Sequence, residues 1–297
     1  MHNRKLSEAK LNLEKIVEER TAALKHKEQE ITDSIRYALR IQLSIIPTPE
    51  RVKALLPKSM VFYKPKDIVS GDFYWVDEIN EEVLFAAVDC TGHGVPGAMM
   101  SVIGLKSLTQ AIQDRKLSRP ADILQHLDIA VNDTLRQSSD VNAVKDGMDL
   151  ALCNINYKTM TLQYAGAFNA VCIIRKNIST TYTPASDKEV FYGTDILEIK
   201  SDKFPIGSNT DGIADTFTNH TFRLQKEDLI YIYTDGYADQ FGGPKQKKFK
   251  YNKLKDVLVS MAELPIEEHY RVLDNALKTW QGAQEQVDDV LVIGVRV

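Results

Sequence analysis

The chain has 297 residues, 43% of them apolar, and a formal net charge of −4. This length allows one large domain or two small ones, and the apolar content is enough to bury a core. A mildly acidic chain is a poor candidate for general nucleic-acid binding, which depends on an excess of Lys and Arg against phosphates. We therefore expect no nucleic-acid partner.

The N-terminus and the cysteines indicate the compartment. Residues 1–6 are polar and charged, so no signal peptide is visible, and no apolar run approaches the roughly 18 residues needed to span a bilayer. Cys90, Cys153 and Cys172 are far apart and form no Cys-x-x-Cys pair. We interpret them as reduced core residues and expect a cytoplasmic protein with no membrane segment in this chain.

Residues 4 to about 46 contain no Pro or Gly, which predicts one long helix. Apolar residues repeat every seven positions at Val17, Leu24, Ile31, Ala38 and Ile45. The companion position is apolar at Leu13 and Ile41 but polar at Arg20, Lys27 and Ser34. This pattern is typical of a coiled coil with a weakened seam. We favour a parallel homodimer over a single helix packed on its own domain, because so polar a helix has little to stabilise it alone.

Pro47 and Pro49 end this helix, because proline cannot continue one. We therefore assign residues 1–46 to dimerisation and signal transmission, and residues 47–297 to a second domain. From Val52 onward we expect strands. The first predicted strands are Met60–Tyr63, Gly71–Val76 and Val83–Asp89, and two helices follow at Ala98–Gln113 and Ala121–Gln137.

Three further segments predict a three-strand meander: Met148–Tyr157, Thr161–Ala165 and Ala170–Arg175. Residues 178–212 are ambiguous and end in a Phe-Pro-Ile-Gly turn at 204–207. The remaining predicted elements are strands at Thr216–Arg223, Asp228–Tyr233 and Val290–Val297, and helices at Leu254–Met261 and Ile266–Gln281. Runs of strands with paired helices favour an α+β sandwich, in which two sheets pack face to face with helices outside.

Aspartates mark the ends of four predicted strands. Asp72 begins a strand after Gly71, Asp89 ends an apolar strand, Asp235 follows another, and Asp288 and Asp289 lead directly into the last. Each of them alone could be a turn residue. Four such strand ends in one domain favour a shared site instead.

The segment from Asp89 to Ala98 reads Asp-Cys-Thr-Gly-His-Gly-Val-Pro-Gly-Ala. Its glycines would let the backbone approach a ligand closely. An ordinary strand-to-helix turn does not need an Asp, a His and three glycines together. A nucleotide-binding loop is a weaker alternative, because the spacing matches neither Gly-x-x-x-x-Gly-Lys-Ser/Thr nor Gly-x-Gly-x-x-Gly after a plain strand.

The aspartates indicate metal chemistry. Carboxylate oxygens are hard ligands that suit Mg²⁺ or Mn²⁺ rather than zinc. Gathered without cations, they would repel one another and their pKa values would rise. Two ions can hold one water between them and activate it toward phosphorus. We therefore expect two Mn²⁺ or Mg²⁺ ions as cofactors.

The ordered motifs resemble the metal-dependent Ser/Thr protein phosphatases of the PPM, or type 2C, family. They are Gly71-Asp72, Asp89-x-x-Gly-His-Gly, Thr234-Asp235-Gly236 and Asp288-Asp289. The Asp89–Ala98 segment, Met148-Asp149, Tyr164–Ala167 and Tyr233–Gly243 are similar to the bacterial SpoIIE/RsbU branch. The resemblance covers about residues 35–297. It implies an α-β-β-α sandwich with a dimetal site at one edge of the two sheets.

The resemblance also implies roles for individual residues. Asp89 would bridge both ions, and the backbone carbonyl of Cys90 would complete one coordination shell. Asp72 would contact the site directly or through water, and Asp235 and Asp288 would hold one ion, with Asp289 the weaker metal candidate of its pair. The implied reaction is hydrolysis of phospho-Ser or phospho-Thr by a metal-activated water, with no phosphoenzyme.

Two residues have implied roles beside the metals. His93 is a candidate general acid for the leaving alkoxide; the alternative is a His that shapes its loop. Gln42 lies in the segment 38–47, which resembles a helix that couples dimer state to assembly of the metal site; the alternative is simple packing. No clear match to the phosphate-binding Arg of the eukaryotic enzymes is present.

The expected partners are a phosphoprotein substrate, such as an anti-sigma-factor antagonist, and an upstream sensor module. The alternative function is a catalytically inactive phosphatase-fold interaction module. It is disfavoured because all four Asp positions are filled. The basic run Lys245–Lys250 is either a solvated loop or a surface that attracts the substrate.

Overall fold

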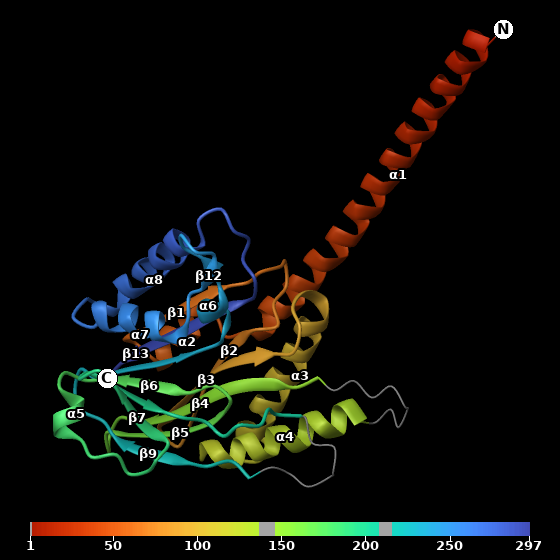
Figure 1. The fold of residues 1–297 in the computed structure, drawn as a ribbon. Helices are drawn as coiled ribbons and strands as arrows, with labels where there is room; N and C mark the ends of the chain where they lie inside the picture. The colour runs from red at the N-terminus through yellow and green to blue at the C-terminus, as the bar shows by residue number, and fades with distance from the viewer. Residues whose placement is uncertain (1, 137–145, 208–215) are drawn as a thin grey trace.

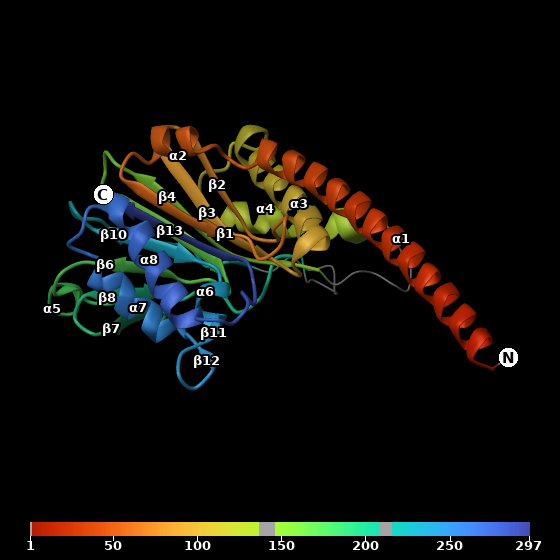
Figure 2. The ribbon, with the colours of Figure 1, turned by 90° about the horizontal axis from the view of Figure 1, so that it is seen from above.

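The computed structural model describes residues 2–136, 146–207 and 216–297. Helix α1 (His2–Ile45) is a single helix of 44 residues that projects from the body of the molecule (Figure 1). Its base lies beside helix α3 (Gly94–Gln113) (Figure 2). This confirms the long N-terminal helix. None of the described helices combines the length and the apolar character needed to cross a membrane.

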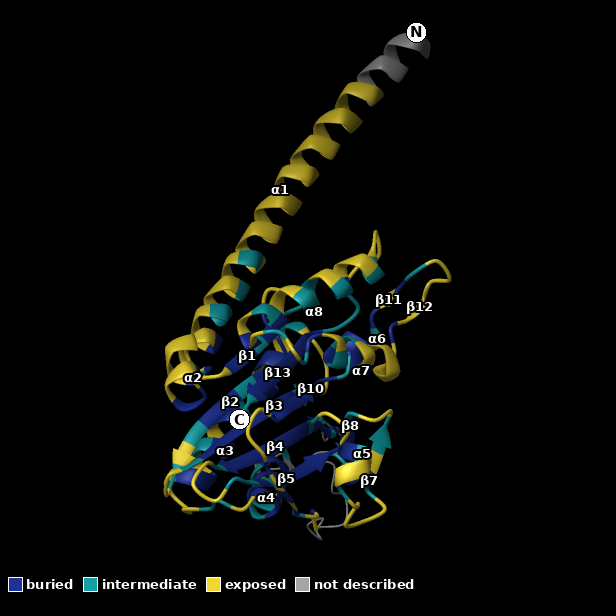
Figure 3. Cartoon of the chain, turned by 90° about the vertical axis from the view of Figure 1, so that its left-hand side faces the viewer, coloured by how far each residue is buried: buried dark blue, intermediate teal, exposed yellow. Residues whose placement is uncertain are grey.

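Most of α1 is exposed to solvent (Figure 3). Val17 is 55% exposed, Leu24 71% and Ile31 60%. Near the end of the helix, in contrast, Gln42 is buried and Ile46 follows it into the core. The apolar repeat therefore finds no partner within the described part of this chain, and the coiled-coil dimer stays a prediction.

Two antiparallel sheets form the centre of the fold. In spatial order, the first contains β1 (Ser59–Lys64), β13 (Val290–Arg296), β10 (Leu229–Tyr233), β6 (Val171–Ile174), β8 (Ile196–Ile199) and β7 (Glu189–Tyr192). The second contains β2 (Phe73–Ile79), β3 (Glu82–Cys90), β4 (Met148–Asn156), β5 (Thr161–Ala167) and β9 (His220–Arg223). Side chains from both sheets, including Phe85, Tyr164 and Ile232, form one core cluster between them. The sheets therefore pack face to face.

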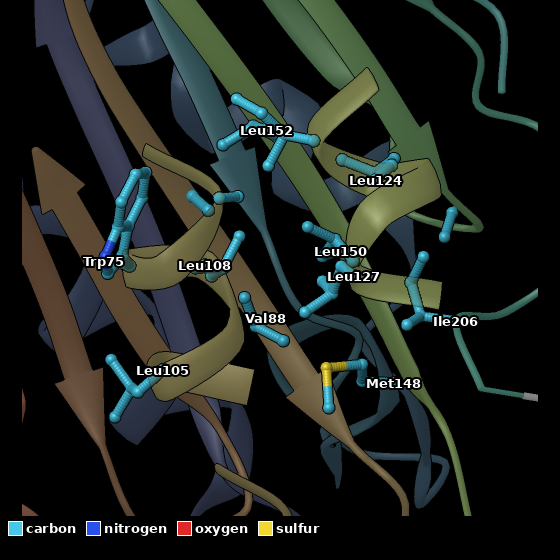
Figure 4. Packing of buried hydrophobic residues seen from close by; sticks show 14 of the residues in the cluster. Trp75, Val88, Leu105, Leu108, Leu124, Leu127, Met148, Leu150, Leu152 and Ile206 are labelled. Atoms are coloured by element: carbon cyan, nitrogen blue, oxygen red, sulfur yellow. The ribbon is translucent and has the colours of Figure 1, made fainter. Parts of the chain in front are cut away.

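Helices cover the outer face of each sheet. Helix α3 and helix α4 (Pro120–Arg136) pack on the β2–β5 sheet through residues such as Leu108, Leu124 and Leu127 (Figure 4). Helices α7 (Tyr251–Ser260) and α8 (Ile266–Gln281) pack on the other sheet. The layers are thus α-β-β-α, as predicted.

Strand β3 shows why the central strands are apolar almost throughout. Leu84, Ala86 and Val88 face the helices, whereas Phe85 and Ala87 face the other sheet. Alternate residues of a strand point to opposite faces, and here both faces are covered. The strand can therefore end at Asp89 with its position fixed on both sides.

The predicted three-strand meander is wrong. Strand β6 does not continue the sheet of β4 and β5 but pairs with β10 and β8 in the other sheet. After Ala167 the chain turns at Phe168, which has a positive φ of 56°, and crosses between the sheets. Strand propensity records where a strand lies in the sequence but not which sheet it joins, so the pattern could not show this crossing.

Several element boundaries also differ from the prediction. Residues 49–55 form a short helix, α2 (Pro49–Leu55), rather than strand, because Thr48 caps it and Pro49 suits its first turn. The ambiguous span contains α5 (Ile178–Thr181), β7 and β8, and its last residues, 208–212, lie outside the described part. Helix α6 (Gly236–Asp239) precedes a small hairpin of β11 (Phe241–Gly242) and β12 (Lys247–Lys248), which carries the basic run.

Candidate metal centre

A pocket of about 200 Å³ lies at the edge where both sheets end. Four carboxylates line it: Asp89, Asp149, Asp235 and Asp288. Asp89 and Asp149 are directly paired across β3 and β4, whereas Asp235 follows β10 and Asp288 precedes β13. Antiparallel pairing brings the end of one strand beside the start of the next, so each sheet contributes two carboxylates to one place.

The carboxylates destabilise one another's charged forms. Burial raises the pKa of Asp89 to about 10, and the charges of Asp72, Asp235 and Asp288 contribute to this shift. Burial, with the charge of Asp235, raises the pKa of Asp149 to about 6. Burial also raises the pKa values of Asp235 and Asp288. Bound cations would remove this repulsion, because they favour the ionised carboxylates.

Asp72 lies behind the pocket wall. Its side chain is 3% exposed, and its Oδ2 accepts a hydrogen bond of 2.6 Å from the hydroxyl of Thr234. Burial raises its pKa well above the ordinary value, and neighbouring carboxylates, led by that of Asp289, add to this. The structure thus brings Asp72 into the electrostatic cluster but not onto the surface of the pocket.

Asp288 and Asp289 have different surroundings. Asp288 lines the pocket. Asp289 is buried, and its two carboxylate oxygens accept hydrogen bonds from the backbone amides of Lys66, at 2.7 Å, and Gly71, at 2.8 Å. Asp289 therefore holds the segment that leads to Asp72, and its oxygens are already used by these amides.

The backbone of the loop after Asp89 packs too closely for side chains. A Cβ placed on Gly97 would lie 2.2 Å from the carbonyl oxygen of Gly92, and one on Gly71 would lie 2.5 Å from the same oxygen. Gly92 itself has a positive φ of 84°. These glycines fix the path of the loop, so that Cys90 becomes part of the pocket wall.

His93 lines the same pocket and precedes the first turn of α3. Its Nδ1 lies 2.6 Å from Oδ2 of Asp67, and both side chains are about half exposed. A carboxylate can only accept, so this contact places the proton on Nδ1 and fixes the orientation of the ring. The structure thus brings His93 to the metal centre.

Gln42 connects α1 to the metal centre. Its side chain is 2% exposed. Its Nε2 donates to the carbonyl of Ser70 at 2.6 Å and to the hydroxyl of Ser101 at 2.9 Å, and its Oε1 accepts from the amide of Ser70 at 3.2 Å. Ser70 is two residues before Asp72, and Ser101 belongs to α3. One side chain therefore joins the helix, the Asp72 segment and the helix that follows the glycine loop.

Sequence reasoning missed three residues of the site. Asp149 belongs to one of the motifs but is not among the predicted ligands, and no role is predicted for Asp67 or Thr234. Asp149 could have been found from the register of β3 and β4, which sets it opposite Asp89. Asp67 stands in a loop without periodic pattern, so no sequence signal pointed to it.

The donor set fits two hard divalent cations. Carboxylate oxygens and a backbone carbonyl are the ligands that Mg²⁺ and Mn²⁺ prefer. Among the residues that the structure describes, no three His, Cys, Asp or Glu side chains already form a ready-made ligand group. The carboxylates instead line the pocket walls together, and bound cations would offset the burial and the mutual repulsion that raise the pKa of Asp89.

An α-β-β-α sandwich with a carboxylate pocket at the common edge of its sheets defines a protein phosphatase domain of the PP2C type. The family model that matches residues 80–297 is described as stage II sporulation protein E (SpoIIE). The chain therefore belongs to the SpoIIE family. No curated protein matches it significantly in sequence.

Solved structures agree with this assignment. The SiaA-PP2C domain of Pseudomonas aeruginosa is 29% identical, with a TM-score of 0.75 over 91% of this chain and 98% of that one. The phosphatase domain and regulatory fragment of Bacillus subtilis SpoIIE is 16% identical, with a TM-score of 0.57 over 80% and 62%. RsbX, in complex with magnesium, is 14% identical, with a TM-score of 0.50 over 80% and 94%. The last two show likeness of fold alone.

Proposed function

We propose that this chain is a Mn²⁺- or Mg²⁺-dependent phosphatase that hydrolyses phospho-Ser or phospho-Thr on a bacterial signalling protein. The observation that carries the proposal is the pocket of four carboxylates at the common edge of the two sheets. The family of the chain and the magnesium complex of RsbX support the choice of cation. The filled carboxylate positions argue against an inactive interaction module.

Each residue of the site has a proposed role toward the two ions. Asp89, whose carboxylate lies among the others, would bridge both ions, with the carbonyl of Cys90 beside it. Asp235 and Asp288 would hold one ion, and Asp149 is a further ligand candidate from the pocket wall. Asp72 would act from behind through water. When bound, two such ions activate a water and neutralise charge on the phosphate.

Asp289 and Thr234 serve the site as positioning residues. Asp289 holds the backbone of Gly71, and Thr234 holds the carboxylate of Asp72. Because both partners belong to the segment before β2, these two bonds set where Asp72 lies relative to β10 and β13. Asp289, which was first considered a metal ligand, is proposed to act in this way instead.

His93, when both of its ring nitrogens carry a proton, would give the Nε2 proton to the leaving Ser or Thr oxygen as the bond from that oxygen to phosphorus breaks. Its Nδ1 contact with Asp67 keeps the other ring nitrogen, Nε2, available for this transfer. The metal centre and His93 lie in the same pocket, so both can reach one phosphate ester.

Regulation is proposed to act through α1. A parallel coiled coil formed by the exposed seam of residues 13–45 would join two chains and connect them to an upstream sensor module. Gln42 would pass the state of that coil to Ser70 and Ser101. We propose that residues 1–46 form the regulatory helix and that residues 47–297 form the phosphatase domain. We also propose that the protein is cytoplasmic and that an anti-sigma-factor antagonist is an example of its substrate.

The experiment that tests the activity measures Mn²⁺- and Mg²⁺-dependent hydrolysis of an aryl phosphate. We expect Asp89→Asn and Asp235→Asn to lose at least about 100-fold in kcat, because removing a ligand carboxylate weakens charge stabilisation. Asp114→Asn is the matched control, since Asp114 is exposed at the opposite end of α3. Metal-independent activity, or equal activity in all four proteins, would refute the proposal. Sedimentation with and without residues 1–34 tests the dimer, and a monomer in both cases would refute it.

A further inference from the structure

A second cavity, of about 460 Å³, lies beside the metal centre. Phe168, Asn169, Lys200, Lys203, Tyr233 and Tyr251 are among the residues that line it. They come from the turn after β5, the segment after β8, the end of β10 and the start of α7. We call this cavity the lysine groove.

The lysine groove and the metal centre share an edge of the fold. Tyr233 directly precedes Thr234 and Asp235 in the sequence. The aromatic rings of Tyr233 and Tyr251 lie 5.9 Å apart. Burial raises the pKa of Tyr251, and the carboxylates of Asp235, Asp239, Asp89 and Asp149 raise it further, which places this phenol near the metal ligands. The groove is therefore within reach of a peptide bound at the metals.

The charge of the groove is positive. Lys200 and Lys203 are at its margin, and neither makes an ion pair with a described residue. Among the described residues that line the groove, the one acidic residue is Glu198, and it is neutralised by Lys255, whose Nζ lies 2.7 Å from the Glu198 carboxylate and whose side chain is 8% exposed. The groove thus offers two cations to a ligand, beside a pocket that would itself hold cations.

Asn169 independently indicates a ligand, because its side-chain amide has a hydrogen-bond donor without a described acceptor. It is 8% exposed, and its Nδ2 is buried without a hydrogen-bond acceptor among the described residues. The backbone carbonyl oxygen of Asn169 accepts from the hydroxyl of Tyr164 at 2.6 Å, which fixes the main chain at this position. A buried donor without an acceptor is costly, so a ligand that brings an oxygen atom here would be favoured.

Apolar surface is also open at the groove. Phe168 is 49% exposed and Tyr251 is 41% exposed. Exposed aromatic rings beside a polar cavity are typical of a surface that binds another protein. Phe168 is also held in place by the turn between the sheets, since it has a positive φ and its amide donates to the carbonyl of Asp202 at 2.9 Å.

We propose that the lysine groove binds the part of the phosphoprotein next to the phosphorylated residue and selects an Asp or Glu side chain accompanied by an apolar one. This rests on the proposed function, since it places the phosphate at the metal centre. Lys200 and Lys203 attract the carboxylate, Asn169 donates to it, and Phe168 and Tyr251 contact the apolar side chain. The groove makes the enzyme selective among phosphoproteins, which the metals alone cannot do.

The test uses the full chain with Mn²⁺ and two phosphoserine peptides. The acidic peptide carries Asp and Glu beside the phosphoserine, and the neutral peptide carries Asn and Gln at the same positions. The readout is the ratio of the two kcat/KM values. We expect wild type to prefer the acidic peptide by about tenfold, and Lys200→Glu/Lys203→Glu to abolish or invert this preference. Lys176→Glu/Lys226→Glu is the matched control, because it makes the same charge change at two exposed residues near the opposite end of β10 and should keep the ratio.

The outcomes separate the groove from the proposed function. If wild type shows no preference, or if the groove and control variants change the ratio equally, the groove proposal is overturned. If the protein hydrolyses neither peptides nor an aryl phosphate, the proposed function fails, and the groove is then judged by fluorescence anisotropy with the same labelled peptides. Binding that favours the acidic peptide and is lost only in Lys200→Glu/Lys203→Glu would support it; equal binding of both peptides would overturn it.

Discussion

Thr234 directly follows β10 and Asp72 directly precedes β2, which are strands of different sheets, and the hydrogen bond of 2.6 Å between their side chains joins the two sheets at the metal centre. The same Thr234 hydroxyl accepts from the amide of Leu291 at 3.1 Å. Thr234 thus fixes the start of β13, which Asp288 precedes by two residues, relative to the segment before β2.

We expect Thr234→Val to lower kcat/KM for an aryl phosphate by about 10- to 100-fold and to raise the Mn²⁺ concentration needed for half-maximal activity. The isosteric change leaves the Asp72 carboxylate and the Leu291 amide without their partner, which raises the pKa of Asp72 further. Thr234→Ser keeps the hydroxyl and should stay within about threefold of wild type. A Val variant as active as the Ser variant would contradict the role given to this bond.

We expect substitution of Asp288 to affect mainly activity and substitution of Asp289 to affect mainly stability. We expect Asp288→Asn to reduce activity at least about 100-fold with little loss of thermal stability, because its side chain faces the pocket. Asp289→Asn should lower the free energy of unfolding by about 1–3 kcal/mol, because an amide group can accept only one of the bonds from Lys66 and Gly71. Thermal unfolding in chelator and metal-titrated activity check both. The opposite pattern would make Asp289 the ligand.

We expect the side-chain amide of Gln42 to contribute to both stability and activity. Gln42→Leu should lower the free energy of unfolding by about 1–3 kcal/mol and lower activity, since the buried NH and CO of Ser70 lose their partner beside Asp72. Gln29→Leu is the matched control, because Gln29 is exposed on the same helix, away from the seam. Equal activity of the two variants across a Mn²⁺ titration would rule out Gln42 as the connection between α1 and the metals.

The crowded carboxylates predict a pH dependence for the metal-free protein. Because the pKa of Asp89 is raised in the folded state, its contribution to stability is present below its unfolded pKa, near 4, and is lost as the pH rises toward 10. The melting temperature in chelator should therefore fall between pH 5.5 and 8.5. Asp89→Asn should flatten this fall and gain on the order of 1–3 kcal/mol at pH 8.

Added metal should reverse the loss of stability at high pH in the wild-type protein but not in Asp89→Asn. Mn²⁺ compensates the charges of the ionised carboxylates, so it should raise the melting temperature of wild type at pH 8 and have much less effect on Asp89→Asn. A metal-free wild type whose stability is the same at pH 5.5 and 8.5 would contradict the repulsion inferred at this pocket.

The sequence was sufficient for the layers and for three of the aspartates that line the pocket, Asp89, Asp235 and Asp288, because these follow from local pattern. The apolar run of β3 and its final Asp89 are visible without any partner strand. What could not be predicted depends on pairing between distant segments. Nothing local to Ala170–Arg175 says that β6 leaves the sheet of β5, and nothing local to Asp149 says that it faces Asp89.

The two adjacent aspartates illustrate the same limit. Asp288 and Asp289 are neighbours with identical chemistry, and only the position of Gly71, more than 200 residues earlier, makes one of them a backbone anchor. Gln42 is the converse case, since the resemblance of segment 38–47 already singles it out. Its three partners became clear only when the loop before β2 and helix α3 were both in place.

Under the proposed regulation through α1, the length of this helix determines what kind of mechanical signal can reach the enzyme. Its 44 residues form a rod of about 66 Å, anchored near one end by Gln42. A sideways displacement of 5 Å at the free end tilts such a rod by only about 4°. Rotation about the long axis is not reduced in this way, because every turn of the rod rotates by the same angle. An input that twists α1 would therefore reach the Gln42 amide undiminished, whereas one that merely bends it would be largely lost along the lever.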